Sequence, residues 1–182
     1  GRSSAFATVL LKHLFARKRS DYLRRDDKTV IDPIEMLALA NHELLELHVN
    51  KYATMVVGCL DFDAHTLQYS VAGHLPKPVL MTPDHIDYLP GEGMPVGLTP
   101  DASYGLEQLS LPDTFMLVLM SDGVLETIEE VDLIEREKTL LARLGGSLEK
   151  PGDLIRRLDL GEVTSDDLAD DIAGLFVSRG VG

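Results

Sequence analysis

Six consecutive apolar residues, 115–120, lead directly into Ser121-Asp122-Gly123. The run is too short to span a membrane, and its length predicts a strand buried on both faces. An aspartate at the end of such a strand lies at the rim of the core, and the glycine behind it permits a tight turn. This position suits a carboxylate that binds a metal ion. It also suits a plain polar turn, so the tripeptide alone leaves both interpretations open.

Short apolar segments alternate with turn residues through the middle of the chain and predict antiparallel pairing. The segments before and after Asp63-Ala64-His65 form one expected hairpin, and those around 82–85 form a second. Together the pattern predicts strands at 52–62, 66–72, 79–81, 86–89, 104–111, 115–120 and 172–177.

Apolar residues at helical spacing predict helices at 3–17, 33–47 and 131–144, with a short helix or turn at 153–158. The second helix has a clear start, because Asp32 can cap it and Pro33 fits the first helical position. Residues 21–29 are expected to be a charged loop. His42 lies off the apolar stripe of the second helix and is expected to be exposed.

Composition narrows the class of protein. The 182 residues suit one domain. The chain carries 17 Lys plus Arg against 30 Asp plus Glu, a net charge of −13, which argues against nucleic acid and anionic membranes as partners. Cys59 is the single cysteine, so no internal disulfide forms and a reducing, cytoplasmic location is expected. We find no signal peptide and no apolar run of transmembrane length.

A second carboxylate pair, Asp170-Asp171, directly precedes the last expected strand. Two aspartates at strand ends can share hard cations, since Mg²⁺ and Mn²⁺ prefer oxygen ligands. His74, in Ala72-Gly73-His74, is open to three interpretations: a group behind the metal ligands, a proton donor, or a turn residue. Asp61-x-Asp63 lacks the glycine of a calcium loop and is interpreted as a turn.

Several motifs occur together in one order along the chain. They are Tyr52-x-Thr54, Gly58, Asp61, Leu67-x-Tyr69-x-x-Ala72-Gly73-His74-x-Pro76, Gly93-x-Pro95-x-Gly97-Leu98, Ser121-Asp122-Gly123-x-x-Glu126 and Asp170-Asp171. In this combination the chain resembles the SpoIIE-type branch of the PP2C-like, metal-dependent serine/threonine phosphatases of bacteria. The resemblance covers nearly the whole chain.

The resemblance implies an α+β fold, a four-layer α-β-β-α sandwich of two antiparallel sheets flanked by helices. It also implies two Mn²⁺ or Mg²⁺ ions and water attack on a phosphoserine or phosphothreonine. Asp122 and Asp170 match metal ligands and would be the catalytic pair. The resemblance also implies residues that lie next to these ligands without binding the metal, namely Gly73, His74, Gly123, Glu126 and Asp171.

The resemblance also bears on the extent of the domain and on its partners. Residues 1–182 would be one phosphatase domain, truncated within its first metal-binding motif, so that one more metal aspartate lies upstream of Gly1. The implied substrate is a phosphorylated regulator such as an anti-anti-sigma factor, and the implied upstream neighbour is a receiver or sensor domain. An alternative is a weakly active or inactive docking module of a response-regulator adaptor for a stress sigma factor. Ala173 departs from the family, where Thr or Ser is frequent.

Overall fold

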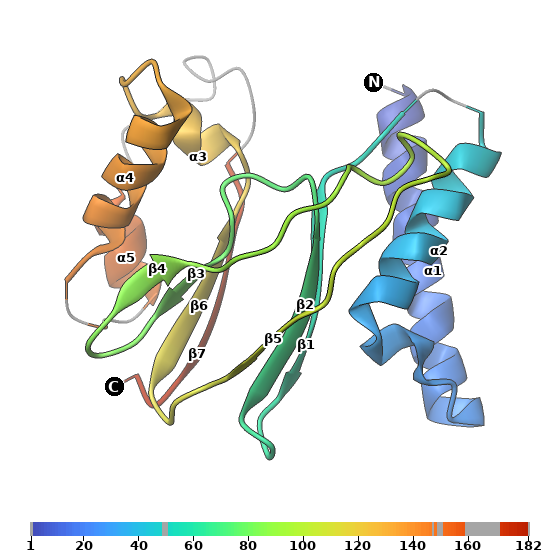
Figure 1. Cartoon of the computed structure of the whole chain (residues 1–182), viewed down its shortest axis with the longest axis horizontal. Helices are drawn as coiled ribbons and strands as arrows, with labels where there is room; N and C mark the ends of the chain where they lie inside the picture. The colour runs from blue at the N-terminus through green and yellow to red at the C-terminus, as the bar shows by residue number, and fades with distance from the viewer. Residues whose placement is uncertain (1, 49–50, 147, 149–150, 159–171, 182) are drawn as a thin grey trace. The chain divides into compact units, whose positions relative to one another are not determined.

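The chain folds as an α+β protein with two antiparallel sheets (Figure 1). The structure is a computed structural model and describes residues 2–48, 51–146, 148, 151–158 and 172–181. The strand orders are β1-β2-β5 and β4-β3-β6-β7. The chain divides into two compact units, unit 1 with Gly1–His74 and Pro90–Ser110 and unit 2 with Leu75–Leu89 and Leu111–Gly182.

The sheet of unit 1 is built on the expected hairpin. β1 (Met55–Asp61) and β2 (Thr66–Ala72) pair antiparallel, from Met55 opposite Ala72 to Asp61 opposite Thr66. The Asp61 carboxylate accepts hydrogen bonds from the backbone N–H groups of Asp63 and Ala64 at 2.9 and 2.7 Å, which fixes the turn. β5 (Glu107–Ser110) adds to β2 but is shorter than the expected strand, because Tyr104 forms an isolated bridge with Gly93 instead.

Two long helices belong to unit 1. α1 (Arg2–Arg25) is longer than the expected helix, so the prediction of a charged loop at 21–29 is wrong for its first five residues. The charged side chains there form a solvent-facing helical turn, with Arg25 and Asp21 paired at 3.6 Å across i, i+4. The short 3-10 helix η1 (Lys28–Ile31) follows.

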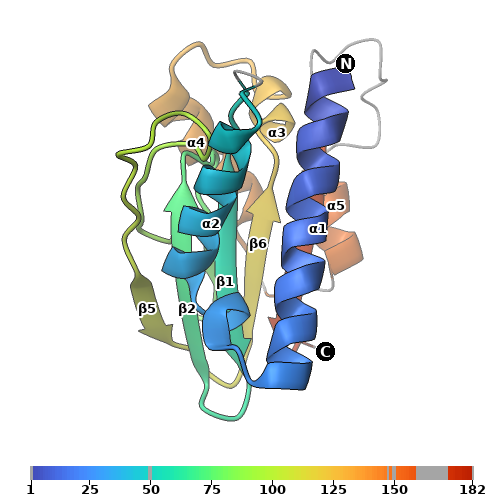
Figure 2. The same cartoon turned by 90° about the vertical axis from the view of Figure 1, so that its right-hand side faces the viewer.

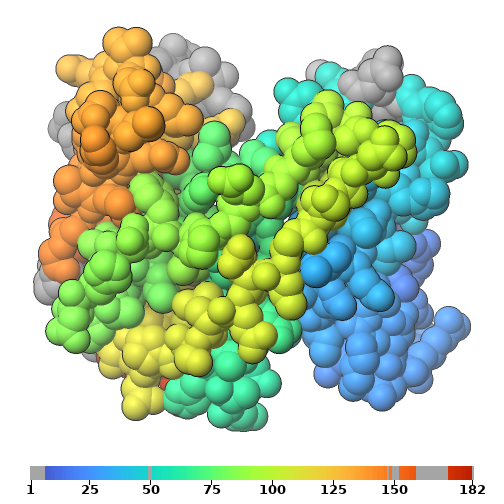
Figure 3. Space-filling view, in the orientation of Figure 1, coloured from blue at the N-terminus to red at the C-terminus, as the bar shows by residue number. Residues whose placement is uncertain are grey.

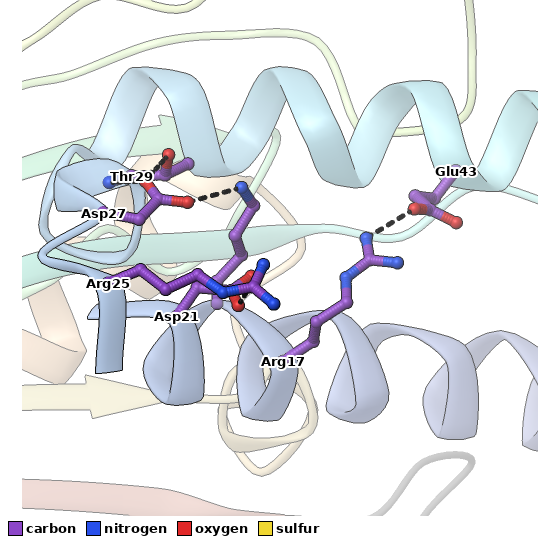
Figure 4. Close-up of polar contacts among 7 residues, drawn as sticks. Arg17, Asp21, Arg25, Asp27, Thr29 and Glu43 are labelled. Atoms are coloured by element: carbon purple, nitrogen blue, oxygen red, sulfur yellow. Dashed lines mark hydrogen bonds and ion pairs between the residues drawn. The ribbon is translucent and has the colours of Figure 1, made fainter. Parts of the chain in front are cut away.

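Charged groups hold these helices together (Figure 4). Arg17 of α1 pairs at 3.0 Å with Glu43 of the next helix, α2 (Pro33–Glu46), and Lys18 pairs with Asp27 at 3.0 Å. Asp27 also accepts hydrogen bonds from the hydroxyl and the backbone N–H of Thr29. These bonds, with Lys18, lower the pKa of Asp27 to about 2. Arg17 and Lys18 of α1 are therefore both paired with acidic residues of the same unit.

The second helix forms as expected. α2 (Pro33–Glu46) begins at Asp32, whose carboxylate accepts from the N–H groups of Ile34 and Glu35. α2 packs on β1 and β2, and α1 lies beside α2 (Figure 2). His42 is exposed, as expected. The buried apolar cluster between helices and sheet contains Ala7, Leu14, Met36, Leu37, Ala40, Leu44, Val57, Ala72, Val96 and Tyr104.

The sheet of unit 2 is centred on the run that ends in Ser-Asp-Gly. β6 (Phe115–Met120) is paired on both sides, with β3 (Val79–Met81) and with β7 (Gly174–Arg179). β4 (Ile86–Tyr88) completes the sheet next to β3. Five of the six residues of β6 are buried, so the expected buried strand is confirmed.

One face of this sheet is covered by helices α3 (Gly123–Glu126), α4 (Leu133–Leu144) and α5 (Pro151–Arg157) (Figure 1). α4 begins at Leu133 because Asp132 caps it. The Tyr88 hydroxyl donates to the Glu137 carbonyl at 2.9 Å, and burial raises the pKa of Tyr88. Within the described residues, no helix is long and apolar enough to cross a membrane.

Candidate functional site

The end of β6 presents an aspartate as the sequence predicted. Asp122 is separated from the buried strand by Ser121 alone, is exposed, and starts the short helix α3. Its backbone carbonyl accepts from the Leu125 N–H at 2.8 Å. Within the described part of the chain, its carboxylate makes no capping bond to α3. The hydrogen bond to Leu125 therefore fixes the backbone of Asp122. Its carboxylate does not cap α3, so capping does not compete with a ligand for the two oxygens.

Ser121, the residue before Asp122, is hydrogen-bonded to Ala173, the residue before β7. Its N–H donates to the Ala173 carbonyl at 2.9 Å, and its hydroxyl accepts from the Ala173 N–H at 2.8 Å. Both Ala173 groups are backbone atoms, so the departure from Thr or Ser at this position leaves the pairing intact. The antiparallel register thus brings the residues that follow Asp170-Asp171 against the residue that precedes Asp122.

Two other predicted residues lie near Asp122 in the chain. Gly123 is buried at the first position of α3, and Glu126 is exposed at its end. The sequence pattern did not predict α3, because four residues are too few to show helical periodicity. Asp170 and Asp171 lie outside the described residues. In the part of the chain that is described, no group of three or more His, Cys, Asp or Glu side chains is placed to hold a metal ion.

Unit 1 contains the other predicted site residues, Gly73 and His74, in the turn after β2. Gly73 has φ +63°, and a Cβ added there would lie 2.7 Å from the Pro95 Cγ. Glycine is therefore required twice, by the left-handed backbone and by the close approach of the proline. His74 is half-buried in the same turn. Gly73 and Pro95, which are 22 positions apart in sequence (95 − 73), thus meet at this turn.

The loop that carries Pro95 is anchored by buried groups. Val96 and Ala53 exchange backbone hydrogen bonds of 2.9 Å. The buried side chain of Asn41 on α2 accepts from the Gly97 N–H at 2.7 Å and donates to the Thr99 carbonyl at 3.0 Å. The loop runs over the surface of unit 1 in yellow-green (Figure 3).

The start of the same loop is held by β2. The Tyr69 hydroxyl donates to the Pro90 carbonyl at 2.6 Å, and burial raises the pKa of Tyr69 to about 12. At Gly93 a Cβ would lie 2.3 Å from the Val71 carbonyl oxygen, so this glycine also allows a close backbone approach. Gly91 and Gly93 are explained by packing against β2, and Gly97 by packing against α2.

The sequence analysis missed the role of Asn41. The residue lies on the apolar stripe of α2, between Leu37 and Leu44, where a polar side chain is out of place. That exception was the available signal, because a buried amide on such a stripe needs hydrogen-bond partners. Its partners could not be predicted, since Gly97 and Thr99 are more than fifty residues away.

Solved structures of other proteins have the same fold as this chain. Among the matching solved structures are the RsbU and RsbW domains of Rv1364c from Mycobacterium tuberculosis, with 23% identity and a TM-score of 0.72 over 100% of this chain and 50% of that one. The PP2C phosphatase domain of SpoIIE from Bacillus subtilis, solved with a fragment of its regulatory domain, matches with 17% identity and a TM-score of 0.72 over 96% of this chain and 49% of that one. RsbX in complex with magnesium matches with 15% identity and a TM-score of 0.67 over 98% of this chain and 75% of that one. The chain therefore has the α+β fold of PP2C-type phosphatase domains.

The family follows from the sequence match. Residues 1–180 match the family described as Stage II sporulation protein E (SpoIIE), and the chain belongs to that family. It spans about half the length of two of the solved proteins just named. No match was found among curated protein sequences.

Proposed function

We propose that the protein is a metal-dependent serine/threonine phosphatase that dephosphorylates a regulatory protein partner in the cytoplasm. The observation that carries the proposal is the exposed Asp122, one residue beyond Ser121 at the end of the buried strand β6, in a chain of the SpoIIE family. The partner we propose is an anti-anti-sigma-like regulator, and the domain would act downstream of a receiver or sensor domain. RsbX, RsbU and SpoIIE domains among the similar structures support this proposal.

The residues at the end of β6 suit a hard cation. The Asp122 carboxylate is exposed and is not used to cap α3, and carboxylate oxygens are the ligands that Mg²⁺ and Mn²⁺ prefer. We propose Asp122 and Asp170 as ligands of two such ions. Bound there, the ions would supply the positive charge that activates water and stabilises a phosphoryl group.

Covalent geometry supports the pairing of these aspartates. Ala173 is hydrogen-bonded to Ser121, the neighbour of Asp122. Asp170 is three residues from Ala173, and a chain spans at most about 3.6 Å per residue. The Cα atoms of Asp170 and Ala173 therefore cannot be more than about 11 Å apart. We therefore expect the carboxylates of Asp122 and Asp170 to reach a shared metal site, although 48 positions separate them (170 − 122).

The chain's own residues would hold this site in place. The two Ser121–Ala173 hydrogen bonds join the ends of β6 and β7, so neither strand end moves without the other. The buried side chains of β6 fix the direction in which the backbone enters α3. Preorganised ligands of this kind reduce the cost of arranging charge during the reaction.

The test is phosphate release from a phosphoserine peptide and from p-nitrophenyl phosphate by the full-length protein. We expect hydrolysis with Mn²⁺ or Mg²⁺ and its loss on addition of a chelator, because the reaction depends on bound ions. A folded full-length protein that is inert toward both substrates with both metals would contradict the proposal. That result would favour the docking module for a stress sigma factor.

A further inference from the structure

Unit 1 has a pocket of about 560 Å³ at the C-terminal end of α2. Its walls include Leu44 from α2, Tyr52 from the segment before β1, and Leu98 from the loop that carries Pro95. In Figure 1 this end of α2, the loop and the end of β2 lie at the same end of unit 1. The pocket therefore shares its loop with the Gly73–His74 turn.

The walls are built by close packing. A Cβ added at Gly97, whose φ is +84°, would lie 2.7 Å from the Lys51 carbonyl oxygen and 2.9 Å from the Leu44 Cβ. The Gly97 N–H is held by Asn41 at 2.7 Å, so the loop cannot lift away from α2 without breaking that bond. Because residue 97 has no side chain, the loop packs closely against α2 at this side of the pocket.

Large apolar side chains are exposed around the opening. Tyr52, which is 62% exposed, and Leu98, which is 48% exposed, line the pocket, and Met94, which is 47% exposed, lies in the same loop as Leu98. Ala53 and Val96 form a β-bridge, which brings the segment that contains Tyr52 next to the loop that contains Met94 and Leu98. Exposed apolar side chains that gather beside a concave site are a mark of protein interaction surfaces.

The polar groups of the pocket favour an anion. His48 and Lys51 line it, both exposed, and no acidic residue is among the described residues of its lining. The His48 Nδ1 donates to the Glu46 carbonyl at 2.7 Å, so in the neutral ring Nε2 is an acceptor, and Lys51 carries the positive charge of this lining. The chain as a whole has a net charge of −13, so a lining whose described residues include a lysine and no acidic residue differs in sign from the chain as a whole. The Lys51 ammonium and the Tyr52 hydroxyl are able to donate to a carboxylate.

We infer that this pocket binds a segment of the phosphoprotein substrate in which an apolar side chain is followed by an acidic one. The apolar side chain would enter between Leu44, Tyr52 and Leu98, and the carboxylate would meet Lys51. The inference rests on the proposed phosphatase function, which it extends by a class of substrate sequence. The pocket would act in substrate binding and leave the chemical step unchanged.

The test uses four phosphoserine peptides that differ only in one dipeptide, Leu-Glu, Leu-Lys, Ser-Glu or Ser-Lys, set at several distances on either side of the phosphoserine. We expect the Leu-Glu peptide to have the highest kcat/KM, about tenfold above Ser-Lys, through a lower KM, because burying one leucine and pairing one carboxylate stabilise binding by that order. The variants Leu98→Ser and Lys51→Glu should remove this preference. Turnover of p-nitrophenyl phosphate, which has no flanking residues, should not change.

Matched control variants exist in the same unit. Leu106→Ser removes another exposed leucine, and Lys12→Glu reverses another exposed lysine, both outside the pocket. The controls should keep the preference for Leu-Glu. The inference is overturned if Leu98→Ser and Lys51→Glu keep the preference, if they lower aryl phosphate turnover by the same factor, or if the parent shows no preference.

Direct binding separates this inference from the proposed function. If the protein hydrolyses neither substrate, the phosphatase proposal fails, and fluorescence anisotropy with the same labelled peptides still tests the pocket. Tighter binding of the Leu-Glu peptide by the parent than by Leu98→Ser supports the pocket in that case. Equal binding by the two proteins overturns it.

Discussion

Among single residues, Gly73 is the most constrained of the predicted site positions. Its φ of +63° and the 2.7 Å approach of Pro95 to an added Cβ both exclude a side chain. We expect Gly73→Ala to lower the free energy of unfolding by about 1–3 kcal/mol, through backbone strain and displacement of the loop. Gly105→Ala is the control, because no described atom lies within 4 Å of its added Cβ. Equal urea midpoints for the two variants would show that the turn tolerates a side chain.

Between elements, the clearest link is the one that Asn41 makes from α2 to the loop. Replacing Asn41 with Leu fits the apolar surroundings but leaves the Gly97 N–H and the Thr99 carbonyl without their partner. We expect the free energy of unfolding in urea to fall by about 1–3 kcal/mol, because both groups are half-buried and a fully buried unpaired group costs about 1–3 kcal/mol by itself. The Gly97 amide should also exchange its hydrogen faster. His42→Leu, exposed on the same helix, should change stability by less than about 0.5 kcal/mol. Unchanged protection of the Gly97 amide in Asn41→Leu would contradict this link.

The elements differ in how far the sequence predicted them. β6 and the β1–β2 hairpin were predicted because a continuous apolar run and an alternating pattern around a polar turn are local signals. α1 continues past the expected end because its last turns are charged on every side and stabilised by pairs such as Arg25–Asp21. β5 is shorter than expected because Tyr104 pairs with Gly93, a contact that local pattern does not encode.

Across the whole molecule, sequence reasoning predicted the class of fold and the position of Asp122 better than it predicted the contacts around it. Motif order alone indicated the family, which the match over residues 1–180 shows. The meeting of Gly73 with Pro95 and of Ser121 with Ala173 depends on which distant segments pack together. The metal roles of Asp122 and Asp170 remain predictions.

Those metal roles are tested most directly by the Mn²⁺ dependence of p-nitrophenyl phosphate hydrolysis in Asp122→Asn. This change keeps the shape of the side chain and removes one negative charge from a site expected to hold two dications. We expect the rate to fall about 100-fold or more, as when a group that stabilises developing charge is lost, and half-saturation to need more Mn²⁺. Folding should persist, because Asp122 is exposed at the end of β6.

Asp84→Asn is the matched control, since Asp84 is an exposed aspartate in the β3–β4 turn of the same unit. It should keep the rate and the Mn²⁺ dependence of the parent. If Asp122→Asn is folded and hydrolyses the substrate with the parent's rate and Mn²⁺ dependence, Asp122 is not a metal ligand and the account of the site is wrong.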